Sequence, residues 1–220
     1  MQRNRIVVVD YHKGNLLSVA RSVTDVGGDV LISDDPRTIR EAEGVILPGV
    51  GSFEDAMSYM VEAGQADAVL ASIVSGVPFL GICLGQQLLY SQGFERSGET
   101  DGESVEPVKG LGVLEGSVTK LDAGRLKVPH VGWDQLHLSD TGRRCPLFVD
   151  VAEGANVYFT HSFALADDID QDTVATRTHY TRTFASSVWK DNVFGVQFHP
   201  EKSSSTGLAI LRNFVNIVRG

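Results

Sequence analysis

In the first half of the chain, short apolar runs alternate with stretches whose apolar residues recur at helical spacing. The runs at residues 6–9, 30–32, 44–47 and 77–82 predict strands, and the run at residues 6–9 is typical of a strand buried on both faces. Helices are predicted over residues 16–27, with Asn15 as the N-cap, and over about residues 52–64. Strands separated by helices favour a parallel sheet that is covered by helices on both faces.

The second half of the chain is rich in valine, threonine and aromatic residues. Strands are predicted at residues 117–121, 157–160, 173–178, 186–189 and 193–198, and they indicate an antiparallel extension of the sheet. Apolar residues at positions 208, 211, 215 and 218 predict a C-terminal amphipathic helix that packs on the sheet. We therefore expect an α/β fold, an open and mostly parallel twisted sheet, in a single domain over residues 1–220.

The segment from Gly93 to Gly110 interrupts this alternation. It is rich in glycine, and it carries the acidic residues Glu95, Glu99, Asp101, Glu103 and Glu106. The segment predicts an acidic surface loop, which we expect to lie away from the reactive residues described below.

Composition excludes several classes of protein. The 220 residues include 19 Lys and Arg against 28 Asp and Glu, for a net charge of −9, which disfavours a surface that neutralises nucleic-acid phosphates. No apolar stretch is long enough to span a membrane. The two cysteines lack the spacing of a zinc site, so we expect no metal and a soluble protein in the reducing cytoplasm.

Cys83 lies in the segment Gly81 to Gly85, where a buried strand meets a helix. Small residues on both sides predict a tight turn that places the thiol beside the helix N-terminus, where the thiolate is favoured. The backbone N–H of Leu84 would then face a carbonyl oxygen under attack. The alternative is that Cys83 is a buried cysteine that only fills the core. We interpret the second cysteine, Cys145, in that way.

Two further segments support a reactive Cys83. His199 follows an apolar strand and can take the thiol proton, while Glu201 can orient its imidazole, although a surface turn is the alternative. The loop from Pro48 to Gly51 also follows a strand, and its glycines let backbone N–H groups approach an oxyanion. Each segment lies at the carboxyl end of a predicted strand, where open α/β sheets bind ligands.

Residues 81–87 and 197–201 together resemble the nucleophile and His–Glu motifs of the class I glutamine amidotransferases. Within that family, residues 10–16, 48–53, 129–133, 158–163 and 199–204 resemble the glutaminase subunits of imidazole glycerol phosphate synthase, an enzyme of histidine biosynthesis. The resemblance implies that Cys83 is the nucleophile, His199 the base and Glu201 the orienting acid in the hydrolysis of L-glutamine through a thioester.

The resemblance also implies a partner and further site residues. The ammonia would pass to a (β/α)8-barrel cyclase subunit, which makes imidazole glycerol phosphate and AICAR from PRFAR, and no cofactor is implied. The implied oxyanion residues are Gly49, Val50, Gly51 and Leu84. The implied substrate-binding residues are Gln87, His161, Ser162 and Phe163. The implied interface residues are Asn15, His130, Trp133 and Tyr158.

Two other interpretations stay open. The chain departs from the pattern of this branch at His12, Gln86, Asp134 and Phe163. It could instead be a glutaminase subunit for anthranilate, guanylate, formylglycinamidine or pyridoxal phosphate synthesis. A catalytically idle binding module on the same fold is the alternative from another class.

Overall fold

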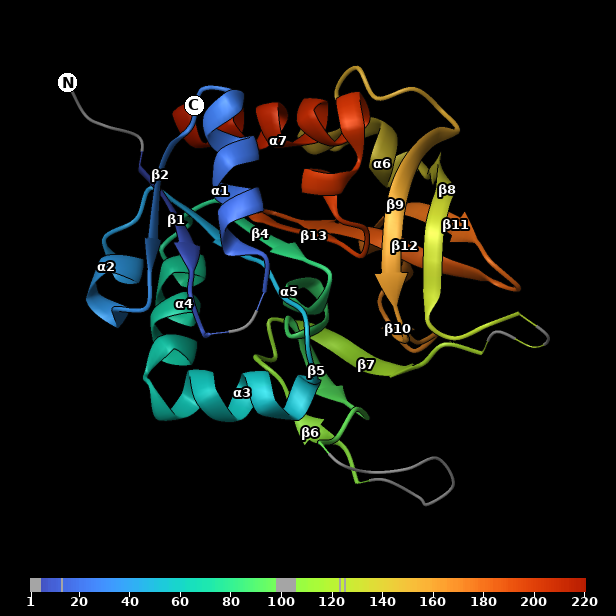
Figure 1. Cartoon of the computed structure of the whole chain (residues 1–220), viewed down its shortest axis with the longest axis horizontal. Coiled ribbons are helices and arrows are strands. Elements are labelled where there is room, and N and C mark those ends of the chain that lie inside the picture. Colours follow the sequence, from blue (N-terminus) through green and yellow to red (C-terminus); the bar gives the residue numbers. More distant parts are fainter. Residues whose placement is uncertain (1–4, 13, 98–105, 123, 125) are drawn as a thin grey trace.

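The computed structural model describes residues 5–12, 14–97, 106–122, 124 and 126–220, and its centre is a nine-stranded sheet between two layers of helices (Figure 1). The strand order is β2-β1-β3-β4-β13-β12-β11-β8-β9. The parallel half comprises β1 (Arg5–Val9), β2 (Asp29–Ser33), β3 (Gly44–Leu47), β4 (Phe79–Ile82) and β13 (Val193–Val196). The antiparallel half comprises β8 (His130–Leu138), β9 (Ala155–His161), β11 (Val174–His179) and β12 (Thr183–Lys190). The predicted α/β sheet with an antiparallel extension is confirmed.

Helices cover both faces of the parallel half (Figure 1). One layer contains α1 (Leu16–Asp25) and α7 (Ser204–Arg219), and the other contains α2 (Pro36–Arg40), α3 (Phe53–Glu62) and α4 (Gln65–Val74). The short helix α6 (Asp140–Arg144) instead packs against β8 and β11 of the antiparallel half. Along β1, Ile6 and Val8 join the core beneath α1 and α7, whereas Val7 and Val9 join the core on the opposite face. Burial on both faces explains the unbroken apolar runs of these strands.

Short elements complete the fold. Single 3₁₀ turns occupy Pro146–Phe148 (η1), Gln171–Thr173 (η2) and Pro200–Lys202 (η3). None of the helices within the described ranges is long and apolar enough to cross a bilayer.

A second sheet was not predicted. Its order is β10-β7-β5-β6, from β5 (Tyr90–Gly93), β6 (Val108–Lys109), β7 (Leu114–Lys120) and β10 (Phe163–Leu165). The predicted loop over residues 93–110 is therefore bounded by two paired strands, with Gln92 opposite Lys109. A two-residue strand is too short to give a periodic pattern. Three of the acidic positions of that loop, Glu99, Asp101 and Glu103, lie outside the described residues.

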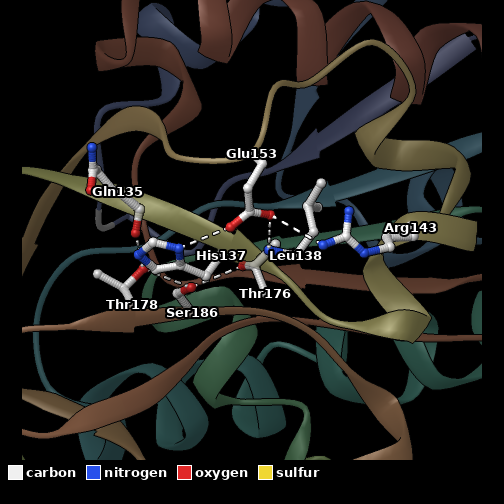
Figure 2. Close-up of polar contacts among 8 residues, drawn as sticks. All are labelled: Gln135, His137, Leu138, Arg143, Glu153, Thr176, Thr178 and Ser186. Carbon is white, nitrogen blue, oxygen red and sulfur yellow. Dashed lines mark hydrogen bonds and ion pairs between the residues drawn. The ribbon is translucent and has the colours of Figure 1, made fainter.

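Hydroxyl groups tie the strands of the antiparallel half together (Figure 2). Thr178 Oγ1 donates to the carbonyl of Gln135 and to Ser186 Oγ, both at 2.9 Å. The hydroxyls of Thr176 and Ser186 also lie 2.9 Å apart. Because these three side chains are fully buried, each needs such a partner to offset the loss of water.

A carboxylate ties the end of β8 to the loop that follows η1 (Figure 2). Glu153 is hydrogen-bonded through Oε1 to His137 Nδ1 and accepts from the Leu138 N–H through Oε2, both at 2.9 Å. Arg143 lies 3.7 Å from the same carboxylate. The Leu138 N–H and His137 hold the pKa of Glu153 below its ordinary value. Glu153 is a solvent-accessible carboxylate that pairs with a histidine outside the cleft described below.

Close backbone contacts fix the connection between β4 and α5 (Leu84–Gln87). Cys83 occupies the N-cap position with φ 54° and ψ −108°, a conformation that L-residues rarely adopt. A Cβ at Gly81 would overlap the backbone of Gly85, and a Cβ at Gly85 would overlap the carbonyl oxygen of Leu47. The predicted tight turn is confirmed, and its two glycines are required by sterics.

Gly85→Ala should destabilise the protein strongly, because the added methyl group meets backbone from β3. We expect the free energy of unfolding in urea to fall by about 3 kcal/mol or more. Gly112→Ala is the control: its φ is +66°, but no described atom lies within 4 Å of the added Cβ. This control should cost only about 1 kcal/mol. Equal losses in the two variants would contradict the steric explanation.

Candidate active site

Cys83 lies at the carboxyl end of β4 and at the first turn of α5, with 6% of its surface exposed. Its sulfur lies 3.5 Å from Gln197 Nε2 and 3.9 Å from the carbonyl oxygen of Thr160. The N–H groups at a helix start have no intrahelical partners, and they favour negative charge nearby. The surroundings of the sulfur therefore contain several donors and one carbonyl acceptor.

The pairing of β4 with β13 brings the histidine to the cysteine. Val196 is in register with Ile82, so the residues that follow both strands emerge side by side. His199 is 2% exposed, and its Nδ1 lies 2.9 Å from Glu201 Oε1. Burial disfavours the imidazolium, but interactions with Cys83 and Glu201 outweigh it and raise the pKa of His199 to about 9. The structure thus brings the three predicted side chains together.

A cleft of about 480 Å³ opens in front of Cys83. The predicted substrate residues Gln87, His161, Ser162 and Phe163 line it, as do the predicted oxyanion residues Val50, Gly51 and Leu84. The fourth oxyanion residue, Gly49, lies against the Tyr11 hydroxyl and Leu84, and a Cβ there would overlap that hydroxyl. Gly51 has φ 109°. Both positions therefore require glycine for a physical reason.

The polar groups of two lining residues are already engaged. Gln87 Nε2 donates to the carbonyl of Phe163 at 2.9 Å and to Gln197 Oε1 at 3.0 Å. His161 donates from Nδ1 to the same carbonyl, and its Nε2 lies 3.1 Å from His130 Nδ1. Burial lowers the pKa of His161 to about 3, so its ring is neutral. His161 forms a wall of the cleft, and both of its ring nitrogens have protein partners.

Sequence reasoning did not predict Glu95, Ser52, Pro129 and Thr160 as lining residues, and Glu95 is the ionisable one among them. We expected its segment to lie away from the reactive residues, and for Glu95 that prediction is wrong. The Phe53 N–H donates to Glu95 Oε2 at 3.1 Å, which holds the carboxylate over the start of α3. Burial raises the pKa of Glu95. No local pattern separates Glu95 from the other acids of that segment, so only the tertiary structure identifies it.

The four predicted interface residues fall into two groups. Trp133 and Tyr158 are paired across β8 and β9, with ring centroids 5.9 Å apart, and Trp133 is 50% exposed. Asn15 is exposed at the start of α1. In contrast, His130 is 1% exposed and bonds to Asp134 at 2.8 Å. Trp133 and Tyr158, hereafter the aromatic pair, are thus available on the surface, whereas His130 lies behind it.

Known proteins of similar sequence share one description. The chain is 43% identical over 215 residues to the imidazole glycerol phosphate synthase subunit HisH of Geobacter metallireducens, which covers 95% of this chain and 96% of the relative. It is 44% identical over 214 residues to the subunit of the same name from Moorella thermoacetica, covering 97% and 95% of the two chains.

More distant solved structures share the fold. PurLQS from Thermotoga maritima matches with a TM-score of 0.71 at 19% identity, over 98% of this chain and 99% of that chain. The glutaminase domain of Trypanosoma brucei CTPS matches with a TM-score of 0.62 at 16% identity, over 96% and 94%. The family model for glutamine amidotransferase class-I matches residues 7–218. With Cys83 on the cleft and the buried His199–Glu201 pair interacting with it, this chain belongs to the class I glutamine amidotransferase family.

Proposed function

We propose that this chain is the glutaminase subunit of an imidazole glycerol phosphate synthase. It hydrolyses L-glutamine and supplies ammonia to a cyclase subunit. The observation that carries the proposal is the interaction of Cys83, which lines the cleft, with a buried His199–Glu201 pair. The names of relatives that are more than 40% identical over nearly the whole chain support the choice of synthase.

The chemistry follows from the positions of these groups. The Cys83 sulfur attacks the side-chain carbonyl carbon of glutamine, and the oxygen becomes an oxyanion beside the Leu84 N–H and the backbone of Val50 and Gly51. The imidazolium of His199 gives its proton to the departing nitrogen, the C–N bond breaks, and ammonia leaves behind a thioester. Neutral His199 then takes a proton from water, which attacks the thioester and releases glutamate.

The cleft also suggests how the rest of glutamine is held. A carboxylate at Glu95 opposes the α-ammonium group of a zwitterionic ligand. Ser162 lines the same space, and we propose its hydroxyl as a further partner of the ligand. Among the implied substrate residues, Gln87 is left with Oε1 as an acceptor because both hydrogens of its Nε2 are engaged.

The aromatic pair is proposed to meet the cyclase barrel. Ammonia released into water is protonated, so efficient transfer needs a docking face close to the cleft. The pair lies on the two strands, β8 and β9, that also carry His130 and the cleft residue His161. We propose a single domain over residues 1–220 that functions in the cytoplasm together with this partner.

Replacing the nucleophile tests the glutaminase step. Cys83→Ala should lower glutamate release in the presence of the cyclase subunit and its phosphoribosyl substrate by at least about 10³-fold. Cys145→Ala is the matched control, because Cys145 is 2% exposed and burial raises the pKa of its thiol to about 12. Full activity in Cys83→Ala would refute the mechanism. Activation by a chorismate-using or ATP-using enzyme in place of the barrel would favour another amidotransferase.

Truncating the aromatic pair tests the docking face. Trp133→Ala should weaken the affinity for the cyclase subunit by about 10-fold to 100-fold, as expected for a buried aromatic anchor. Titration calorimetry measures the Kd, and Val74→Ala provides the control because Val74 is 87% exposed on α4. An unchanged Kd for Trp133→Ala would place the interface elsewhere.

The pH dependence of activity tests the His199–Glu201 pair. With the pKa of His199 raised to about 9, the imidazolium form that protonates the departing nitrogen is lost as pH rises through that value. Glu201→Gln removes one raising interaction, so the alkaline limb of kcat should move to lower pH by about one unit. Glu153→Gln also removes a carboxylate that pairs with a histidine, but at the surface, and should leave the limb in place (Figure 2). Coincident alkaline limbs in wild type and Glu201→Gln would exclude the assigned role.

A further inference from the structure

We propose that Gln197 is a further catalytic residue, whose side-chain amide donates a hydrogen bond to the Cys83 sulfur and favours its anionic form. Gln197 follows β13, two residues before His199, and is fully buried. Its Nε2 lies 3.5 Å from the sulfur. The inference rests on the proposed glutaminase function, since it adds a group to the same nucleophile.

The direction of this hydrogen bond follows from a chain of fixed partners. The carbonyl oxygen of Phe163 can only accept, so the atom of Gln87 that lies 2.9 Å away must be Nε2. The same nitrogen lies 3.0 Å from Gln197, which must therefore present Oε1 to it. The NH₂ group of Gln197 is then left to face Cys83. The amide orientation is thus determined by its neighbours and needs no assumption about the Gln197 side chain itself.

The backbone holds this amide in place. The Gln197 N–H donates to the carbonyl of Ser186 on β12 at 2.9 Å, which continues the pairing beyond the end of β13. Phe163 accepts a second hydrogen bond from His161 at 2.9 Å, so the carbonyl that orients Gln87 is itself fixed. A donor that is held in place before the reaction stabilises charge without a cost of reorganisation.

The sulfur has a different partner for each protonation state. When it carries a proton, it can donate to the Thr160 carbonyl at 3.9 Å. When it is ionised, it can only accept, and the Gln197 amide supplies a neutral donor beside the charged His199. Hydrogen bonds to ionised groups are stronger than those between neutral groups. Gln197 therefore favours the thiolate over the thiol, and Gln87 acts through it as a positioning residue.

Gln86 offers a matched comparison on the same short helix. It is also fully buried and also lies against β13, since it approaches Gly195. Neither amide atom of Gln86 has a hydrogen-bond partner among the described residues. Two buried glutamine side chains of equal size thus differ in whether they reach the sulfur.

Alkylation of Cys83 by iodoacetamide, followed by mass spectrometry of its peptide, tests the proposal without glutamine or a partner. Only the thiolate reacts, so the rate rises with pH to a plateau. In Gln197→Met we expect the midpoint of this rise to move upward by about one pH unit, the effect of losing one hydrogen bond to a charged group. Gln197→Glu should move it further, because a carboxylate replaces the donor. Gln86→Met should keep the wild-type midpoint.

The outcomes separate the two proposals. A Gln197→Met profile that coincides with wild type overturns the role of Gln197, even if wild type hydrolyses glutamine. A shifted profile supports the role, even if glutaminase activity with the cyclase is absent, in which case the proposed function fails instead. A lower plateau with an unchanged midpoint would indicate a purely steric role for Gln197 and would also overturn the proposal.

If the Gln197 variants fail to fold, a measurement on the wild-type Gln197 side chain still tests the proposal. The NH₂ resonances of Gln197, assigned by NMR in the full chain, should shift as Cys83 ionises and should lose that pH dependence in Cys83→Ala. NH₂ resonances of Gln197 that do not shift when Cys83 ionises would overturn the proposal.

Discussion

The close approach of three backbone segments at Gly81, Gly85 and Leu47 is the constraint on which the site depends. A side chain at either glycine would meet main-chain atoms, so α5 can begin directly against the ends of β3 and β4. Cys83 is then forced to a positive φ at the apex of the turn. Such strained conformations are costly and persist where the surroundings enforce them. In this turn, the strained conformation of Cys83 places its thiol at the start of α5.

Strand order adds the remaining groups. Because β3, β4 and β13 are adjacent and parallel, the glycine loop after β3, Cys83 after β4 and His199 after β13 share one edge of the sheet. Strand β9 of the antiparallel half lies against this edge, because the Tyr158 carbonyl accepts a hydrogen bond from the His199 N–H at 2.9 Å. The aromatic pair lies on the same strands, so the proposed docking face and the nucleophile are parts of one rigid framework.

Three polar side chains at or next to the cleft are held by partners within the protein. Gln87, Gln197 and His161 converge directly or indirectly on the carbonyl of Phe163. A network in which donors and acceptors are matched keeps a single arrangement, because a rotated amide would place a donor against a donor or an acceptor against an acceptor. This order suits a site that must stabilise charge on sulfur first and on oxygen next.

The sequence by itself determined the parallel core, the turn at Cys83 and the three side chains that we propose as reactive. These features are local: apolar runs of buried strands, glycines where backbone is close, and short motifs at strand ends. It did not predict β8, the second sheet or Glu95. For β6 of the second sheet and for Glu95 the reason is that a two-residue strand and one acid among five carry no periodic signal. The tertiary structure decided that Glu95 lines the cleft, that His130 is buried behind the aromatic pair, and that the Gln197 amide points its nitrogen at Cys83. These features depend on contacts between residues far apart in the chain, such as the 114 positions that separate Gln197 from Cys83, and no local pattern encodes them.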